Sequence, residues 1–351
     1  MNERIELTKD YTISRVLNGC WQLSEGHSLQ AGLDFKDVMH AFHMLAEQGF
    51  TTFDCADIYT GVEEFIGTFI TELKAGHGVS ADDIQIHTKY VPDINYLSQV
   101  DYASTERIID RSLKRLNRDT LDLVQFHWWD YDVPGCVETA GSLLRLKEKG
   151  KIRNIGVTNF DTAHLKELVD AGIPVVSMQA QYSLFDRRPE RRLLDYCRTN
   201  DIKLLCYGTL SGGFLAERWI GEAAAEPETR SQIKYLQIIE DTLGWDGYQD
   251  LLRLLAGIAE KYKVSISNVA SKYILCQDGV AGAIIGIRNS RHVQSNARIF
   301  GFDLADDEIG RIRNFLQEYP APDGEPFELE RTVGSKYRSI MHMNINEKEQ
   351  S

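Results

Sequence analysis

The sequence lacks several features that define particular classes of protein. Its six cysteines include no CxxC pair, and several lie in apolar, β-branched runs, as buried free thiols do. No stretch of about 18 apolar residues occurs, and the opening segment MNERIELTKDYTIS has no apolar region of the signal-peptide kind. These absences argue against a disulfide scaffold and against membrane insertion. They predict a cytoplasmic protein in a reducing compartment.

Positive charge is also scarce. The chain has 39 Lys and Arg against 52 Asp and Glu, a formal net charge of −13. Such a chain has no basic footprint for nucleic acid and is repelled by an anionic membrane surface. Hydrophobic residues at 43% and charged residues at 26% are ordinary for a folded globular protein, so disorder is not expected. The composition therefore favours a small molecule as the partner.

Short apolar runs recur along the chain with helical patterns between them. They begin at residues 51, 84, 121, 152, 175, 203 and 281, and most starts lie 23 to 37 residues apart, about the length of one βα unit. The segment RVLNGCWQL near residue 16 adds an eighth run. Eight such units predict an α/β protein with a (β/α)₈ barrel. An open doubly wound sheet is the competitor, but no GxGxxG follows an early strand.

Three further segments are predicted around this barrel. We expect one domain over residues 1–351, with the barrel at about 16–318, an N-terminal strand or hairpin before it and a tail at 319–351. The run at 203 is followed by the next only at 281, so a long insertion, about 215–245, follows the seventh strand. Both the insertion and the tail are expected to lie over one mouth of the barrel.

Four ionisable side chains follow the ends of three consecutive predicted strands. Asp54 ends the TTFD run, Lys89 ends IQIHTK, His127 ends LDLVQFH, and Tyr59 lies on the loop after Asp54. Each one alone is best explained as a cap or a hydrogen-bonded surface residue. Together they are unlike four separate caps, because polar residues at the carboxyl ends of barrel strands face a shared mouth.

These residue types suit proton donation to a carbonyl oxygen. A phenol near pKa 10 needs a neighbouring cation to stabilise its phenolate, and Lys89 can supply that charge to Tyr59. Asp54 would keep Lys89 protonated through an ion pair, and His127 could hydrogen-bond the carbonyl oxygen. The set contains no evident nucleophile, so another group must attack the carbon.

The motifs together resemble the aldo-keto reductase family. FDCADIYTGVEEFIG is similar to the strand-two signature of that family, IHTKY to its lysine strand, LDLVQFHWW to its histidine strand and IGVTNF to its Ser/Thr-Asn segment. Further matches are MQAQYSLFDRRPE, CYGTLSGGFL and IIGIRNSRHVQSN, so the resemblance runs from about residue 16 to 300 in family order. It implies that Tyr59 is the general acid, with Asp54, Lys89 and His127 as its tetrad partners.

The resemblance also implies a nicotinamide cofactor, NADPH or alternatively NADH, because a protein side chain cannot supply hydride. The nicotinamide would contact Thr158, Asn159, Gln179 and Tyr207, and the pyrophosphate would contact the loop at Gly208, Leu210 and Gly212. The adenosine end would lie at Gly286, Arg288, His292 and Asn296. A guanidinium at Arg288 can hold a 2′-phosphate, which favours NADPH. His292 and Ser295 depart from the family pattern, which usually has Gln or Arg and then Glu.

The substrate side shows other departures. The first strand reads NGCWQLSEG in place of the usual glycine-rich form, which leaves Cys20 and Trp21 near the mouth. Trp128 and Trp129 form an unusual pair directly after His127. One of the two indoles is expected to pack under the loop, and the other to wall the pocket against an apolar or ring-shaped substrate. The sequence indicates neither the substrate, nor the physiological direction, nor the oligomeric state.

The sequence leaves three alternatives to a carbonyl reductase open. A Schiff-base aldolase would use Lys89 as its nucleophile. A metal-dependent hydrolase is weaker, because His127 and Asp130 are the only nearby pair and no HxH or HxxxH set accompanies them, so we expect no metal. A nicotinamide-binding regulatory subunit with little turnover is the third, since potassium-channel β subunits resemble the same family.

Overall fold

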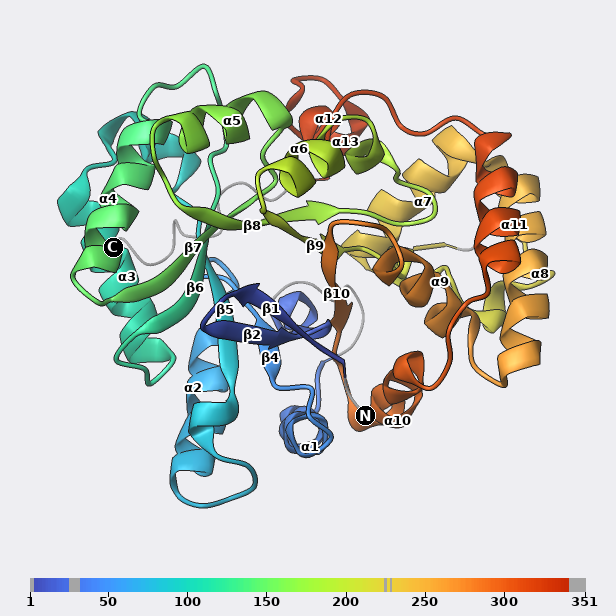
Figure 1. Ribbon diagram of the computed structural model, residues 1–351, viewed down its shortest axis with the longest axis horizontal. Helices are drawn as coiled ribbons and strands as arrows, with labels where there is room; N and C mark the ends of the chain where they lie inside the picture. Colours follow the sequence, from blue (N-terminus) through green and yellow to red (C-terminus); the bar gives the residue numbers. More distant parts are fainter. Residues whose placement is uncertain (1–2, 25–31, 224–225, 228, 341–351) are drawn as a thin grey trace.

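Eight parallel strands form a closed barrel at the centre of the protein (Figure 1). The computed structural model describes residues 3–24, 32–223, 226–227 and 229–340. The strands follow chain order around the barrel, and the last one pairs with the first. Their bounds are β3 (Val16–Gly19), β4 (Thr52–Asp54), β5 (Gln85–Tyr90), β6 (Leu121–Phe126), β7 (Ile152–Thr158), β8 (Val175–Gln181), β9 (Lys203–Tyr207) and β10 (Val280–Gly286). The predicted (β/α)₈ barrel is confirmed.

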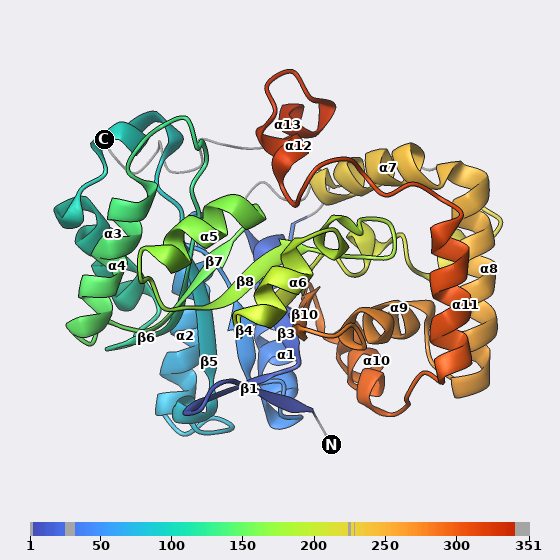
Figure 2. The ribbon, with the colours of Figure 1, turned by 45° about the horizontal axis from the view of Figure 1, so that its top comes forward.

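A short antiparallel hairpin closes the end of the barrel away from the strand carboxyl ends (Figure 2). It consists of β1 (Arg4–Thr8) and β2 (Tyr11–Ser14), and its Leu7, Tyr11 and Ile13 pack on apolar residues of the barrel interior. The Tyr11 hydroxyl also lies 3.1 Å from Nε2 of His87, which faces the interior from β5. The predicted N-terminal hairpin is therefore present and plugs the floor of the barrel.

Helices cover the outside of the barrel, as the alternating sequence pattern predicts. They are α1 (Phe35–Glu47), α2 (Val62–Lys74), α3 (Tyr102–Arg115), α4 (Cys136–Glu148), α5 (Thr162–Asp170), α6 (Leu193–Thr199), α8 (Gly244–Tyr262), α9 (Ile266–Leu275), α10 (Val293–Ala297) and α11 (Asp306–Gln317). Side-chain caps fix several of their starts: Asp101 accepts from the backbone N–H of Ser104 at α3, and Asp161 from that of His164 at α5.

Helix α2 illustrates how a helix is positioned directly after a site loop. Its apolar residues Val62, Ile66 and Ile70 recur at helical spacing and are buried. Gly67 lies so close to the end of α3 that an added Cβ would come within 1.9 Å of the carbonyl oxygen of Arg115. This close contact fixes α2 against α3, and it therefore fixes the loop that precedes Val62.

The insertion and the tail both lie over the carboxyl ends of the strands. The insertion contains α7 (Arg230–Thr242), and the tail contains α12 (Glu328–Arg331) and α13 (Lys336–Ser339), which lie above the barrel beside α7 in Figure 2. The expected placement over one mouth is thus confirmed for these segments. Residues 224, 225 and 228 of the insertion, residues 25–31 after the first strand and residues 341–351 of the tail lie outside the described residues.

Within the described ranges, none of the helices combines the length and the apolar character needed to cross a membrane.

Candidate active site at the carboxyl ends of the strands

The barrel brings three of the four predicted tetrad side chains into direct contact. The ammonium Nζ of Lys89 lies 2.6 Å from Oδ1 of Asp54 and 2.8 Å from the carbonyl oxygen of Cys55. The same Nζ lies 5.0 Å from the centroid of the Tyr59 ring. Asp54 ends β4 and Lys89 lies on the adjacent β5, so parallel pairing places both side chains at one edge. Tyr59 follows in a turn whose backbone carbonyl accepts from the N–H of Val62.

The electrostatics of this trio match the predicted proton donor. Burial disfavours the charged form of Lys89, but the Asp54 carboxylate outweighs it and raises the pKa of Lys89. Burial raises the pKa of Tyr59 to about 12, and the charge of Lys89 acts in the opposite direction. Lys89 is therefore an ammonium at neutral pH, and Tyr59 is a neutral phenol whose proton loss that ammonium assists.

His127 lies at the end of the next strand, and backbone groups of two other strands hold it. Its Nδ1 is 3.0 Å from the carbonyl oxygen of Thr158, and its backbone N–H donates to the carbonyl oxygen of Tyr90. Burial, with a contribution from the charge of Arg331, lowers the pKa of His127 to about 3, so the imidazole is neutral. A carbonyl oxygen only accepts, so Nδ1 carries the hydrogen and Nε2 presents a lone pair. The hydrogen bond predicted between His127 and a carbonyl oxygen stays a prediction, and it requires a hydrogen on Nε2.

Two glutamines that complete the Asp54 environment lie one layer below the mouth. Nε2 of Gln125 is 2.9 Å and Nε2 of Gln179 is 2.7 Å from Oδ2 of Asp54, and Gln179 also donates to Oε1 of Gln125 at 2.8 Å. With Lys89 on the other oxygen, the buried carboxylate is fully paired. Gln179 was predicted as a nicotinamide contact, whereas in this structure its amide nitrogen holds Asp54. Gln125 was missed, although a polar residue within an apolar strand is a visible signal.

Unpaired polar atoms lie at Thr158, a predicted nicotinamide contact, and at two further residues, Thr209 and His127, that were not predicted as such contacts. Oγ1 of Thr158 and Oγ1 of Thr209 are buried and have no hydrogen-bond partner in the described part of the chain. Nε2 of His127 shares this property. Tyr207 donates its hydroxyl hydrogen to Oδ1 of Asn159 at 2.9 Å, which fixes both predicted contacts beside Thr158. Because buried polar atoms normally have partners, this group fits a polar ligand such as a nicotinamide carboxamide.

The loop predicted to approach the pyrophosphate is covered by the insertion. A Cβ added at Gly208 would lie 2.2 Å from the Tyr235 hydroxyl oxygen, and one at Gly212 would lie 3.0 Å from the ring of the same tyrosine. Leu210 is half-buried beside them. Because these two glycines have no side chains, α7 can pack closely on the loop. Binding of a pyrophosphate at this loop would require a shift of Tyr235.

The predicted adenosine contacts lie together after β10. Arg288 and Asn296 are half-buried, and His292 and Gly286 are exposed. A Cβ at Gly286 would lie 2.6 Å from the Gln22 side chain, which crosses this position from the first strand. Arg288 forms no ion pair with the residues that the structure describes, so its guanidinium is available to an anion.

The predicted substrate residues divide into two groups. Trp129 packs edge-on against His127, with ring centroids 4.6 Å apart, and Trp21 lies 4.8 Å from the Tyr59 ring. Trp128 is fully buried, and its indole N–H donates to the carbonyl oxygen of Val133, so it is the tryptophan that packs under the loop. Cys20 is also fully buried, and its backbone N–H donates to the carbonyl oxygen of Asp54.

The tail supplies a residue to the site that the sequence did not reveal. Phe327 is buried, and its ring centroid lies 5.4 Å from that of His127, at a near-perpendicular angle. Its φ of 65° is unusual for a bulky side chain, so its surroundings must hold it in place. Arg331 contributes by donating to the carbonyl oxygens of Trp128, Trp129 and Asn159.

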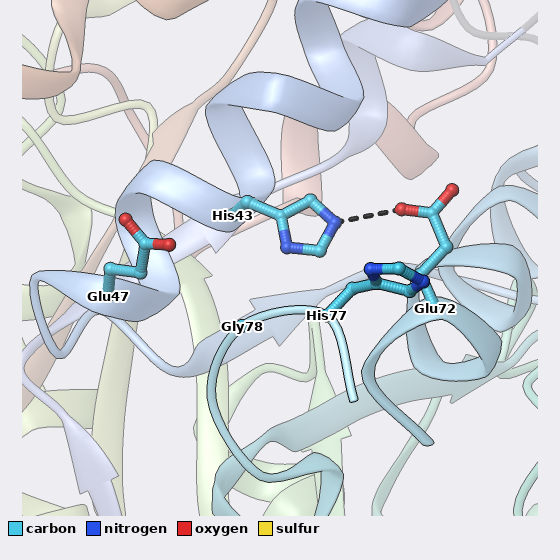
Figure 3. Close-up of a pocket in the computed structure, with 5 residues that line it drawn as sticks. All are labelled: His43, Glu47, Glu72, His77 and Gly78. Atoms are coloured by element: carbon cyan, nitrogen blue, oxygen red, sulfur yellow. Dashed lines mark hydrogen bonds and ion pairs between the residues drawn. The ribbon is translucent and has the colours of Figure 1, made fainter. Parts of the chain in front are cut away.

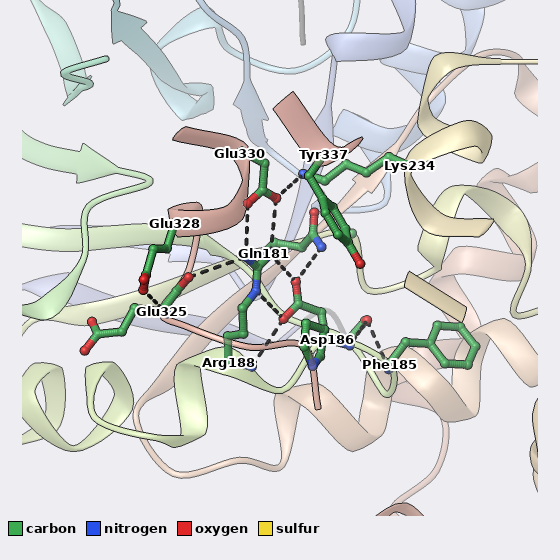
Figure 4. A network of polar contacts seen from close by, with 12 residues as sticks. Gln181, Phe185, Asp186, Arg188, Lys234, Glu325, Glu328, Glu330 and Tyr337 are labelled. Carbon is green, nitrogen blue, oxygen red and sulfur yellow. Dashed lines mark hydrogen bonds and ion pairs between the residues drawn. The ribbon is translucent and has the colours of Figure 1, made fainter. Parts of the chain in front are cut away.

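A buried charge cluster holds the same tail segment from the other side (Figure 4). The guanidinium of Arg188 pairs with Asp186 at 2.7 Å and with Glu330 at 3.0 Å, and Lys234 of α7 lies 2.9 Å from Glu330. Burial opposes the charge of Glu330, yet Lys234 and Arg188 hold its pKa well below its usual range. The cluster balances two acids with two bases, and it ties the tail to both the barrel and the insertion.

A second hollow lies away from the mouth, between α1 and the end of α2 (Figure 3). His43 lies 2.8 Å from Glu72 there, and Glu47, His77 and Gly78 complete the lining. The described residues contain no group of three or more side chains able to hold a metal ion, either here or around His127 and Asp130.

The chain resembles known proteins along most of its length. A sequence model described as the Aldo/keto reductase family matches residues 15–317. The chain belongs to this family. The aldo-keto reductase YhdN of Bacillus subtilis is 30% identical over 311 residues, which cover 87% of this chain and 90% of that protein. The NADH-specific methylglyoxal reductase of Escherichia coli is 25% identical over 334 residues, 88% of this chain and 97% of that protein.

Solved structures show the same fold for this aldo-keto reductase. The glycerol dehydrogenase of Gluconobacter oxydans superposes with a TM-score of 0.76 at 24% identity, and the match covers 92% of this chain and 98% of that one. The holo form of an aldo-keto reductase from Bacillus halodurans gives a TM-score of 0.72 at 23% identity, over 95% and 100% of the two chains. These likenesses support the barrel architecture, and members of the family are oxidoreductases that use nicotinamide cofactors.

Proposed function

We propose that the protein reduces an aldehyde or ketone to an alcohol, or catalyses the reverse reaction, with Tyr59 as the proton donor and NADPH as the hydride source. The observation that carries this proposal is the position of the Lys89 ammonium, 5.0 Å from the Tyr59 ring centroid and paired with Asp54 at 2.6 Å. A fixed ammonium beside a half-buried phenol favours transfer of the phenolic proton to a developing alkoxide.

The roles of the chain's own residues follow from their contacts. Tyr59 would give its proton to the carbonyl oxygen, and a bound nicotinamide would supply the hydride for the carbonyl carbon. Lys89 stabilises the phenolate left behind, and Asp54 holds Lys89. Thr158 and Asn159 would bind the carboxamide, Tyr207 would face the ring, and Arg288 would pair with the 2′-phosphate. Trp21, Trp129 and Phe327 exclude water around the reacting carbon.

The same geometry argues against the aldolase alternative. A Schiff base requires a neutral amine as nucleophile, and the Asp54 carboxylate stabilises Lys89 in its charged form. A regulatory nicotinamide-binding subunit is the second candidate. It is favoured by the packing of α7 on Gly208 and Gly212, because this contact must open before a dinucleotide can bind along the loop.

A panel of aldehydes, ketones and sugars, followed by the absorbance of NADPH, tests the proposal. Each compound is assayed in both directions and again with NADH, since a relative is named as NADH-specific. We expect turnover of at least one carbonyl class with a preference for NADPH. Tight NADPH binding without turnover across the panel would instead support the regulatory subunit.

A further inference from the structure

Helix α7 joins the loop predicted for the pyrophosphate to the tail. Tyr235 on this helix lies against Gly208 and Gly212, where an added Cβ would come within 2.2 and 3.0 Å of it. The preceding residue, Lys234, pairs with Glu330 of the tail at 2.9 Å (Figure 4). Because the two residues are neighbours on one helix, a shift that moves Tyr235 off the loop also moves Lys234. Opening the loop therefore breaks the ion pair between Lys234 and Glu330.

The ammonium of Lys234 lies near the predicted border between nicotinamide and pyrophosphate. Its Nζ is 5.8 Å from the ring centroid of Tyr207, the predicted nicotinamide contact, and Gly208 of the pyrophosphate loop follows Tyr207 in the chain. The Lys234 side chain is only 12% exposed, so water screens its charge less than that of a surface lysine. A chain with a net charge of −13 has to meet an anionic pyrophosphate with local cations, and Lys234 is one at this place.

The tail is also attached to the barrel, independently of α7. Glu330 pairs with the buried guanidinium of Arg188 at 3.0 Å, and Arg331 donates to three main-chain carbonyl oxygens. Toward α7 the tail has a further link, in which the Tyr337 hydroxyl donates to Oδ2 of Asp241 at 2.5 Å. Helix α7 can therefore lose its links to the tail while the tail stays in place over the substrate side of the mouth.

The two partners of the ion pair are left in different situations when α7 moves. Glu330 keeps the guanidinium of Arg188 as its partner. Lys234 forms no ion pair other than that with Glu330 among the residues that the structure describes. Separating a buried pair is costly unless the freed charge finds a new partner, and a pyrophosphate on the adjacent loop is an anion within the same region.

We propose that Lys234 binds the pyrophosphate of the dinucleotide, and that Glu330 of the tail is the internal anion with which the pyrophosphate competes. The tail then sets the nucleotide affinity of the protein, in addition to covering the substrate side of the mouth. The inference rests on the proposed use of a nicotinamide dinucleotide by this chain.

Substitution of the two partners should change nucleotide affinity in opposite directions. Binding of NADP⁺ is measured by calorimetry without a carbonyl or alcohol substrate, so turnover plays no part. Lys234→Met should weaken binding about tenfold, because a charge-assisted hydrogen bond to the pyrophosphate is lost. Glu330→Gln should tighten binding about threefold or more, because the competing anion is gone and the open form is more populated. Lys166→Met, at an exposed position of α5, is the matched control and should bind like the wild type.

A third variant and a nucleotide fragment complete the test. Asp241→Asn weakens the link between α7 and the tail without altering Lys234, so it should also tighten NADP⁺ binding, and it replaces Glu330→Gln should that variant not fold. Adenosine 2′-phosphate has no pyrophosphate and should bind equally to the wild type and to Lys234→Met. Tighter NADP⁺ binding in Lys234→Met would mean that this lysine only fastens α7 to the tail. That result, or unchanged binding in all three variants, would overturn the inference alone, whereas a wild type that binds no NADP⁺ would overturn the proposed function as well.

Discussion

The strand-end tetrad and the lid that covers it are held in place by different means. Asp54 and Lys89 lie on the neighbouring strands β4 and β5, and the parallel pairing of these strands brings both residues to the same edge. The lid, made of α7 and tail residues 325–337, is held by the pairing of Glu330 with Arg188 and Lys234, which come from three distant parts of the chain. Chemistry placed on a regular scaffold tolerates change elsewhere, whereas a lid held by a few buried charges depends on each of them.

Removal of the phenolic hydroxyl should give the largest effect. Tyr59→Phe should lose about 10²- to 10⁴-fold in kcat, because it removes the only proton donor proposed for the carbonyl oxygen. Nucleotide binding, measured by fluorescence titration, should be retained. Tyr196→Phe on α6, far from the mouth, is the matched control and should keep full turnover. Wild-type kcat in Tyr59→Phe would contradict the assignment of this tyrosine as the acid.

A single change in the lid should release it while leaving Asp54 and Lys89 in place. Glu330→Gln leaves Arg188 and Lys234 without their shared carboxylate in a buried place, a loss on the order of 3–5 kcal/mol. We expect faster amide hydrogen exchange in α12 and in α7, with unchanged exchange in β4 and β5. Asp323→Asn, at an almost fully exposed tail position, is the control. Unchanged exchange in α7 would show that the tail does not hold the insertion.

The loop between Asp54 and Tyr59 contains a carboxyl group, that of Asp57, which should make the free energy of unfolding depend on pH. Burial, together with the charge of Glu63, raises the pKa of Asp57 to about 8, above its unfolded value of about 3.9. Between these values the folded protein holds a proton that the unfolded chain releases. The free energy of unfolding should therefore fall as pH rises, by up to about 1.4 kcal/mol per pH unit. Denaturant titrations from pH 5 to 8 should show a shallower decline in Asp57→Asn than in the wild type. Equal slopes would contradict this prediction.

The smallest expected effect on activity comes from a substitution of Gln125, which lies one layer below the mouth of the barrel. Gln125→Leu removes one of the two amides that donate to Oδ2 of Asp54. We expect kcat to fall about tenfold with little change in KM, since one hydrogen bond to a buried charged group contributes about 1.5 kcal/mol or more. Gln249→Leu removes a buried glutamine that donates to the carbonyl oxygen of Trp219, and it should leave kcat unchanged. A rise in KM alone would place Gln125 on the substrate side instead.

The sequence predicts the barrel and the tetrad because both follow from regular periods. Each βα unit repeats, and Asp54, Lys89 and His127 each stand where an apolar run ends, so their meeting follows from strand order. The hydrogen-bond direction of His127 could not be predicted in this way. It depends on a contact with the backbone of Thr158, which belongs to another strand and leaves no mark in the residue types.

The lid was predicted only in outline. The length of the insertion and the apolar tail indicated a cover over the mouth, but nothing periodic connects Arg188 or Lys234 with Glu330. The position of Phe327 could not be predicted from the sequence either, because tertiary contacts impose its left-handed backbone conformation. Side-chain contacts between distant, irregular segments cannot be predicted from a single sequence.

Arg331 attaches the tail through main-chain oxygens of residues 128, 129 and 159 and uses none of their side chains. Every amino acid presents the same carbonyl group, so this attachment makes no demand on the side chains at 128 and 129, whereas the φ of 61° at residue 159 favours asparagine or glycine there. The walls of the chamber can therefore be redesigned, in evolution or in the laboratory, without detaching the segment that roofs it.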